Sequence, residues 1–352
     1  KYGQAFPGAY CETYQPAQAD HDIFKIEKVL KTGKLSLELY QPENADSDTL
    51  RLKLYVPESC VTLSDVLPLL ENMGLRVLSE LPFRIKSEAM DSPVWAHDFL
   101  LKFQQPSAAF KLVDVKETAE EAFTKIWYGD VENDSLNKLV LSAGMSWREI
   151  MILRTYVRYI RQMRTAYSLR FIERTLSENP GIARMLVNMF LACHNPELGD
   201  QGDIRAAGCG VEIDHALEKV ASLDQDRILR LLLTLVTATC RTNYFQPDEQ
   251  GQPKNYLSIK LDSVAISELP DPKPFREIFV YAPSVEGVHL RGDVIARGGL
   301  RWSNRHEDFR TEVLGLMKAQ MVKNAVIVPM GAKGGFVVKR PPAEGGKEAY
   351  VE

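Results

Sequence analysis

The spacing of the apolar residues changes twice along this chain, and this change constrains the fold more than any other feature. Before about residue 105, apolar residues alternate with polar ones in short runs such as 50–57, a pattern typical of strands. Between 106 and 245 they recur at helical spacing, and from Tyr256 the period of two returns. The pattern predicts a multidomain protein of the α/β (α+β) class.

The division into segments follows the same pattern. We predict a linker over residues 1–19, a compact module over 20–105, a helical domain over 106–245 and the start of an α/β domain over 246–352. Strands and helices alternate within the compact module, which indicates a small ferredoxin-like regulatory or packing unit. Because the chain opens on Lys1 with neither an initiator methionine nor a signal peptide, we expect an internal piece of a longer protein.

Local signals place several boundaries. Ser146 and Glu149 form a capping box at the start of a helix, and the run Asn179-Pro180-Gly181 predicts a break between two helices. We expect a strand over 288–296, a helix over 305–323 and a buried strand over 325–328. These last elements surround the residues with the clearest chemical potential.

The overall charge excludes some classes of function. The chain has 43 basic and 47 acidic residues and a net charge of −4, so it has no general attraction to nucleic acid or to a membrane surface. No stretch approaches the roughly 18 apolar residues of a membrane-spanning helix. The five cysteines are odd in number and lack a CxxC pair, which indicates reduced thiols in a cytoplasmic protein. Of these, only Cys193 has a histidine next to it in sequence.

A glycine pair near the C-terminus has an arginine on either side. Arg297 and Arg301 flank Gly298-Gly299, and glycine lets a ligand approach the backbone closely. The guanidinium fork of arginine suits a carboxylate. Either arginine could instead pair with Asp308 or Glu307, which is the more common fate of an exposed arginine.

The last predicted helix ends with two polar residues on an apolar face. Phe309 and Val313 begin that face, and Gln320 and Lys323 continue it three residues apart, as neighbours on the helix surface. A bound carboxylate would supply the partner that a buried charge requires. The alternative is that the helix end emerges into solvent with Lys323 solvated. Lys318 lies on the other side of the helix and should face solvent.

Residues 329–335 read Pro-Met-Gly-Ala-Lys-Gly-Gly and follow an apolar run. We predict a glycine-bounded loop that holds Lys333 inside an otherwise buried stretch. Burial and neighbouring cations favour the uncharged form of an amine, so Lys333 is a candidate general base near neutral pH. The alternative is a glycine-rich turn with an exposed lysine. The GxxxxGK[ST] spacing of a phosphate-binding loop is absent.

Together these motifs resemble the substrate domain of the glutamate dehydrogenase family. Residues 296–302, 320–323 and 329–335 are similar to its glycine-arginine segment, its substrate-binding helix and its catalytic lysine loop. The run 298–339 looks like the large NAD-specific subfamily of bacteria. Residues 20–105 are similar to the ACT-type module that this subfamily carries before its catalytic part.

The resemblance implies NAD-dependent oxidative deamination of L-glutamate to 2-oxoglutarate and ammonia. Lys333 stands where the family has its catalytic lysine, which accepts a proton from the attacking water. Lys323 and Gln320 stand where the family binds the substrate α-carboxylate. Arg297 stands where common members place a lysine for the side-chain carboxylate, and the Gly298-Gly299 backbone lines the pocket.

The resemblance also implies that NAD binds to a domain beyond Glu352, so that the chain alone should not transfer hydride. It implies a cytoplasmic homo-oligomer whose small-molecule partners are L-glutamate and 2-oxoglutarate. Two alternatives remain open. A related amino-acid dehydrogenase for an apolar substrate would not need the cation of Arg297, and a regulatory or oligomerisation module would have a degenerate pocket.

Overall fold

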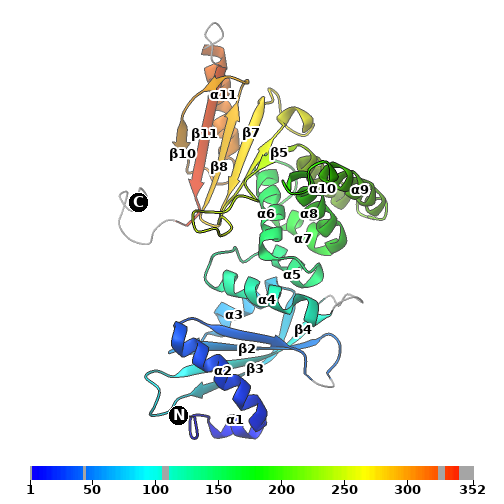
Figure 1. Cartoon of the computed structure of the whole chain (residues 1–352). Helices are drawn as coiled ribbons and strands as arrows, with labels where there is room; N and C mark the ends of the chain where they lie inside the picture. Colours follow the sequence, from blue (N-terminus) through cyan, green and yellow to red (C-terminus); the bar gives the residue numbers. More distant parts are fainter. Residues whose placement is uncertain (1, 43–44, 105–110, 324–329, 341–352) are drawn as a thin grey trace. The chain divides into compact units, whose positions relative to one another are not determined.

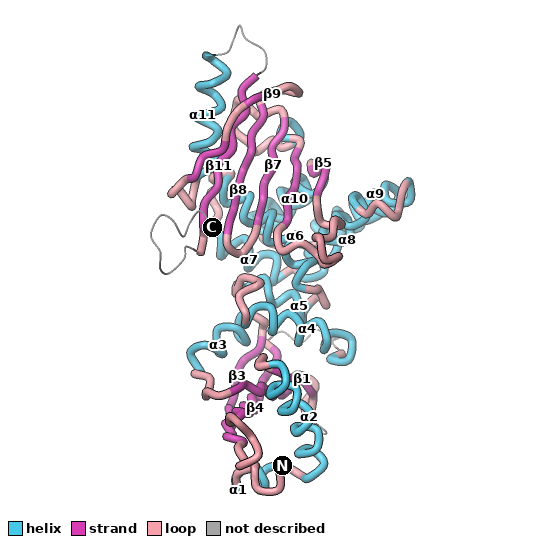
Figure 2. Tube along the Cα trace, turned by 60° about the vertical axis from the view of Figure 1, so that its left-hand side comes forward, coloured by secondary structure: helices cyan, strands magenta, loops and turns pink. Residues whose placement is uncertain are grey.

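The computed structural model describes residues 2–42, 45–104, 111–323 and 330–340 (Figure 1). The chain forms two compact units, residues 1–147 and 148–352, each with its own sheet. Helices and strands alternate in the first unit, whereas a run of helices precedes the sheet of the second (Figure 2). This mixture of helices and sheets confirms the predicted multidomain α/β (α+β) class.

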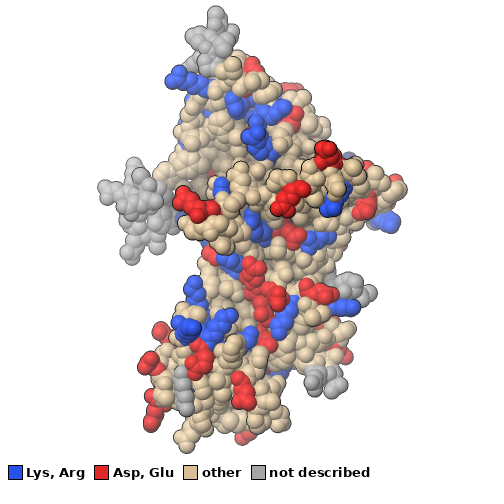
Figure 3. Space-filling view, viewed as in Figure 1, with Lys and Arg blue, Asp and Glu red and all other residues tan. Residues whose placement is uncertain are grey.

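The surface charge follows the balanced composition. Figure 3 shows acidic and basic side chains interspersed over the visible face, without an extended area of one sign. That distribution gives this face no general electrostatic attraction to a polyanion. Among the described helices, none combines the length and the apolar character that crossing a membrane requires.

A four-stranded antiparallel sheet forms the centre of the first unit. Its strands are β1 (Ser36–Tyr40), β2 (Thr49–Pro57), β3 (Leu75–Ile85) and β4 (Val94–Phe103), in the spatial order β1-β2-β4-β3. Helix α3 (Leu63–Asn72) connects β2 to β3, and both strands pair antiparallel with β4 between them. This split βαβ arrangement is that of ferredoxin-like folds, so the predicted ferredoxin-like module is confirmed.

Helices α3 and α4 (Leu112–Trp127) cover one face of this sheet, and η1 (Ser135–Asn137) and α5 (Lys138–Ser142) follow them. Leu37, Leu39 and Leu52 alternate along β1 and β2 and meet Leu70 of α3 and Phe123 of α4. All five side chains are buried. Burial of each such side chain contributes roughly 1.5–3 kcal/mol, so alternation on this face is what holds the helices to the sheet.

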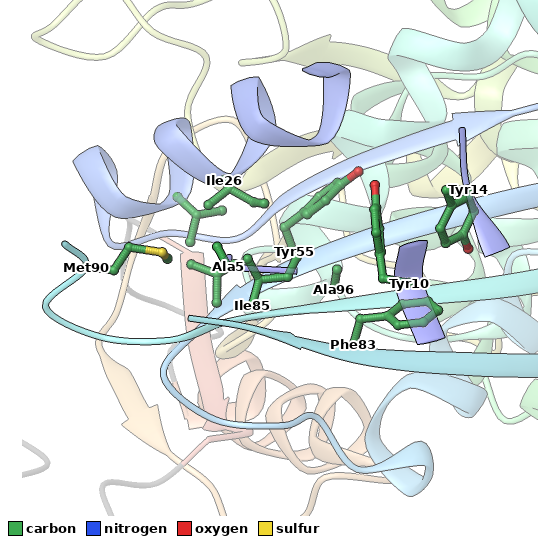
Figure 4. Packing of buried hydrophobic residues seen from close by; sticks show 11 residues of the cluster. Ala5, Tyr10, Tyr14, Ile26, Tyr55, Phe83, Ile85, Met90 and Ala96 are labelled. Carbon is green, nitrogen blue, oxygen red and sulfur yellow. The ribbon is translucent and has the colours of Figure 1, made fainter. Parts of the chain in front are cut away.

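Helices α1 (Gly8–Thr13) and α2 (Pro16–Thr32) cover the other face. Tyr10 of α1 packs with Tyr55 and Phe83 of the sheet in one buried cluster (Figure 4). The described part of the predicted linker, residues 2–19, therefore packs against the unit. The difference arises because Pro7 and Pro16 start helices here: Pro7 is the N-cap of α1 and Pro16 is the first residue of α2, a position that suits proline.

A run of helices opens the second unit. They are α6 (Trp147–Gln162), α7 (Leu169–Glu178), α8 (Pro180–His194), α9 (Asp200–Leu217) and α10 (Leu223–Thr237). The predicted break at Asn179-Pro180-Gly181 is confirmed, because α7 ends at Glu178 and Pro180 begins α8. The capped helix that begins near Ser146 is α6.

Within the described residues, the sheet of the second unit has seven strands. They are β5 (Thr239–Thr242), β6 (Leu257–Leu261), β7 (Arg276–Tyr281), β8 (Val285–Arg291), β9 (Ala296–Arg297), β10 (Leu300–Trp302) and β11 (Met330–Val338), and η2 (Ser263–Ala265) follows β6. Neighbours from β5 to β8, and then β11, pair antiparallel, whereas β9 and β10 pair parallel with β11. Helices α6 and α11 (Phe309–Lys323) pack against one face, where the ring of Tyr159 meets that of Phe279 at 5.5 Å.

The expected strand over 288–296 is divided in two. Strand β8 ends at Arg291, and the chain turns before β9 begins. Asp293 Oδ1 accepts a hydrogen bond from Val294 N at 2.6 Å, and Arg291 Nη2 donates to Val294 O at 2.7 Å. A short polar side chain that bonds the nearby backbone favours a turn over a strand. The expected helix over 305–323 is confirmed from Phe309 onward.

Candidate active site

Strand β11 carries Lys333 between two neighbouring strands. On one side Lys333 is opposite Leu290 of β8, in an antiparallel pair. On the other side β11 pairs parallel with β9 and β10. The predicted loop over 329–335 is therefore wrong from Met330 onward, and the expected strand over 325–328 lies outside the described residues.

Close packing explains why a glycine-rich segment forms a strand here. A Cβ atom on Gly334 would lie 2.2 Å from Cδ2 of Leu300, and one on Gly335 would lie 2.5 Å from Cγ2 of Val313. Both distances are far below the contact distance of non-bonded carbon atoms. The exposed side chain of Leu300 could shift to admit a residue at Gly334, but the buried Val313 of α11 leaves room only for glycine at Gly335.

Lys333 faces helix α11. Side chains alternate along a strand, so Lys333 shares a face with Gly331 and Gly335. A Cβ atom on Gly331 would lie 3.1 Å from Cβ of Gln320 in α11, and Gly335 faces the same helix. The cross-strand partner Leu290 is fully buried, whereas Lys333 is half-buried. The lysine therefore extends along the helix-covered side of the sheet.

Residues 297–299 lie against the same part of β11. Arg297 pairs with Gly331, and its side chain is exposed. A Cβ atom on Gly298 would lie 1.4 Å from the carbonyl oxygen of Ala332. The glycine pair thus brings the backbone after Arg297 into contact with the residue that precedes Lys333.

Gln320 connects α11 to this edge of the sheet. Its Nε2 donates a hydrogen bond to Arg297 O at 3.2 Å. Its Oε1 is buried and has no hydrogen-bond partner in the part of the chain that the structure describes. A buried polar atom without a partner costs roughly 1–3 kcal/mol, so a donor on a bound molecule would be stabilising there. The second hydrogen of Nε2 can donate to an acceptor.

Lys323 is the last residue of α11, three residues after Gln320. The helical backbone gives these two residues the predicted spacing. The side chain of Lys323 lies outside the described residues, so its contact with a substrate carboxylate stays a prediction. Lys318, which was expected to face solvent, is half-buried and donates to Asp271 O at 3.0 Å.

Asp308 and Glu307, the possible partners of Arg297, bind other arginines. Asp308 Oδ1 accepts a hydrogen bond from Arg305 Nε at 2.9 Å, and Glu307 Oε2 accepts one from Arg161 Nε at 2.8 Å. These contacts hold both acids in the segment before α11. They leave the guanidinium of Arg297 to other anions.

Two cations at this edge are therefore available to a ligand. Within residues 2–42, 45–104, 111–323 and 330–340, the side chains of Arg297 and Lys333 form neither an ion pair nor a hydrogen bond. Charge-assisted hydrogen bonds to carboxylates are among the strongest in proteins. The arrangement can bind a small carboxylate beside an amine that is able to exchange a proton.

A buried ion pair anchors α11, and sequence reasoning missed it. Arg310 Nε lies 2.8 Å from Glu277 Oε2, and Tyr159 Oη donates to the same oxygen at 2.8 Å. Burial lowers the pKa of Arg310, but the hydrogen bond and charge of Glu277 outweigh it and raise that pKa above its usual value. Glu277 shares the buried phase of β7 with Phe279 and Tyr281. An acid in the buried phase of an alternating strand is the signal that could have identified it.

Gly298→Ala should destabilise the second unit, whereas Gly299→Ala should leave its stability unchanged. A Cβ atom on Gly298 would overlap the carbonyl oxygen of Ala332, but one on Gly299 meets nothing within 4 Å. Overpacking typically costs about 1–3 kcal/mol. Urea unfolding followed through the fluorescence of Trp302 measures this difference, and equal stability of the two variants would contradict the packing of residues 297–299 against β11.

Comparisons with known proteins match segments of glutamate dehydrogenases along most of the chain. Residues 1–29 match glutamate dehydrogenase helical motif 2, residues 34–116 match its ACT3 domain and residues 131–196 match its helical motif 3. Residues 212–352, which contain the site, match the catalytic domain of bacterial NAD-glutamate dehydrogenase. Each described site residue thus falls within the segment that resembles a catalytic domain.

Three relatives named NAD-specific glutamate dehydrogenase cover 99% of this chain. The protein from Halomonas elongata is 46% identical over 350 residues, that from Pseudomonas aeruginosa 45% over 356 and that from Mycobacterium tuberculosis 43% over 357. The chain spans 21% of the first and 22% of each of the others. These relatives and the four matching segments show that the chain is similar, along nearly its whole length, to part of the bacterial NAD-specific glutamate dehydrogenases.

Proposed function

We propose that the complete protein catalyses NAD-dependent oxidative deamination of L-glutamate to 2-oxoglutarate and ammonia. This chain would contribute the substrate half of the active site. The observation that carries the proposal is the position of Lys333, which faces α11 between glycines, close to Gln320 and Arg297. The names of the relatives supply the reaction, and the unpaired guanidinium of Arg297 suits a carboxylate of the substrate.

The proposed substrate contacts follow from the chemistry of each group. Arg297 binds the side-chain carboxylate, beside the backbone of Gly298-Gly299. Gln320 and Lys323 bind the α-carboxylate, with the free hydrogen of Gln320 Nε2 as donor. Gln320 Oε1 then accepts a hydrogen bond from the α-amino group of glutamate, which satisfies the buried oxygen. Two carboxylate contacts orient Cα for reaction.

Lys333 is the proposed general base. Lys333 is half-buried on the helix-covered face of β11, between Gly331 and Gly335 on that face. There it accepts a proton from the water that attacks Cα of the oxidised substrate. A lysine is suited to this task because, unlike an arginine, it can lose its proton when its surroundings are dry.

The names of the relatives also imply NAD as the cofactor. The described residues do not fit a dinucleotide, because such sites lie at the carboxyl ends of parallel strands with a glycine-rich turn that opens a helix. Parallel pairing in the described part of the second unit is limited to β9 and β10 with β11. We therefore expect NAD to bind elsewhere in the complete protein.

The same proposal includes the organisation of the chain. The ACT3 match over 34–116 supports an ACT-type regulatory module over 20–105, and the matches over 131–196 and 212–352 support a helical segment followed by the catalytic part. We propose that the complete protein is a cytoplasmic homo-oligomer. Size-exclusion chromatography coupled to light scattering of the purified enzyme tests this, and a monomer at micromolar concentration would contradict it.

Arg297→Met should remove the preference of the complete enzyme for L-glutamate over L-leucine. A hydrogen bond to a charged group contributes roughly 1.5–3 kcal/mol, so kcat/KM for L-glutamate should fall about 10- to 100-fold. NAD reduction measured with each amino acid gives the result. An unchanged preference would assign the side-chain carboxylate to another residue, and no turnover of L-glutamate by the native enzyme would contradict the proposed activity itself.

A further inference from the structure

A buried histidine in the first unit connects a thiol to a carboxylate. His97 of β4 is 1% exposed, and its Nδ1 lies 2.8 Å from Glu80 Oε1 of β3. Its Nε2 lies 3.9 Å from Sγ of Cys60, in the segment that follows β2. The three residues lie 17 and 37 positions apart, so the sheet alone brings them together.

The hydrogen bonds define the roles of the two ring nitrogens. Val61 N donates to His97 Nε2 at 3.3 Å, so Nε2 is an acceptor. The proton of the neutral ring is then on Nδ1, which donates it to Glu80. The Cys60 thiol therefore faces an unprotonated nitrogen, although the carbonyl oxygen of Val61, 3.6 Å away, is a second acceptor. A nucleophile, a base and an acid that orients the base form the arrangement found in enzymes with activated nucleophiles.

An open hollow lies beside the thiol. It has a volume of about 380 Å³ and is lined by Cys60 with Ser59, Thr62, Asp65 and Trp127. Cys60 itself is exposed, whereas His97 is buried beneath it. A small molecule can therefore reach Sγ while the base stays shielded from water.

A metal site is the competing interpretation of a cysteine, a histidine and a glutamate. Glu80 and Cys60 contact opposite nitrogens of the ring, so the three groups do not converge on one point. Within the described residues, no group of three such side chains could hold a metal ion. The geometry fits proton transfer along the row of groups and not coordination.

We propose that Cys60 is a nucleophilic thiol that forms mixed disulfides with small disulfide compounds entering this hollow. Sγ attacks one sulfur of the disulfide, a new sulfur–sulfur bond forms to Cys60, and the disulfide's own bond breaks. The second sulfur leaves as a thiolate, and His97 Nε2 takes the proton of Cys60. The negative charge of Glu80 stabilises the resulting imidazolium. The reaction needs no other oxidant, because the disulfide is itself reduced.

Dithiodipyridine is a suitable probe, with mass spectrometry of peptides from the intact enzyme to follow each cysteine separately. Cys240 is the internal control, since it is also exposed and its thiol hydrogen-bonds to the carbonyl oxygen of Ala238 at 3.7 Å. Because Cys60 has a base beside it and Cys240 has none among the described residues, Cys60 should react roughly tenfold faster than Cys240. Equal rates would overturn the proposal.

Two variants separate the base from the charge that supports it. Glu80→Gln keeps an acceptor for His97 Nδ1 but removes the charge, and His97→Asn removes the base. Both should bring the rate of Cys60 down toward that of Cys240, while the rate of Cys240 stays the same. Thermal unfolding checks that each variant is folded. A rate ratio that is unchanged in folded His97→Asn, or in Glu80→Gln, would overturn the proposal.

Discussion

Lys333→Ala should lower kcat of the complete enzyme about 10²- to 10⁴-fold, the usual contribution of a general base. The lysine lies on the helix-covered face of β11, beside the residues proposed to bind both carboxylates. Alanine leaves the strand intact, because no described side chain bonds the lysine amine. Initial rates of NAD reduction at saturating L-glutamate measure the effect.

Two control variants sharpen this prediction. Lys333→Arg keeps the positive charge but cannot act as a base, so its kcat should be as low as that of Lys333→Ala. Lys318→Ala removes a lysine of α11 that binds the carbonyl oxygen of Asp271, away from the site, and should keep near-normal turnover. Near-normal turnover of Lys333→Ala, or of Lys333→Arg, would end the assignment of Lys333 as the base.

Arg310→Met should lower the free energy of unfolding of the second unit by about 3–5 kcal/mol, the usual cost of breaking a buried ion pair. Arg310 is 1% exposed, and its partner Glu277 is fully buried. Without the guanidinium, Tyr159 at 2.8 Å is the one hydrogen-bond donor left to the carboxylate within the described residues. Urea unfolding followed through Trp302, whose strand β10 belongs to the same sheet, measures the loss.

A second substitution tests whether the unpaired charge of Glu277 causes this loss of stability. Glu277→Gln in the Arg310→Met background removes the unpaired charge, while its amide oxygen can still accept from Tyr159, so part of the stability should return. Arg305→Met breaks an ion pair with Asp308 at the surface and should cause no measurable change. If the double variant is less stable than Arg310→Met alone, the buried charge is not the cause.

Local sequence patterns were enough for much of the fold. The alternation at 50–57 and 257–261 predicted β2 and β6, and Pro180 marked the break between two helices. Prolines misled the interpretation of residues 1–19, because proline ends one helix and begins another equally well. The glycines of 331–335 indicated a loop, but these residues form a strand. Glycine is needed at Gly335 because Val313 approaches the backbone closely, and no local pattern reveals this contact.

The candidate site shows the same limit. The motifs pointed to Arg297, Gln320 and Lys333, and the structure places Arg297 on β9, Lys333 on the neighbouring β11 and Gln320 on the helix that packs against β11. Tertiary contacts without a local signal were not predictable. Cys60 meets His97 because strand β4 lies beside β2, and no histidine adjoins Cys60 in the sequence to indicate this contact.

The most direct test of the proposed substrate site is a structure of the complete enzyme with 2-oxoglutarate bound. We predict that one carboxylate lies within about 3 Å of Gln320 Nε2 and the other within about 3 Å of the guanidinium of Arg297. The keto carbon should then face Nζ of Lys333 on the α11 side of β11. A ligand bound elsewhere, with Lys333 pointing away from it, would contradict the account.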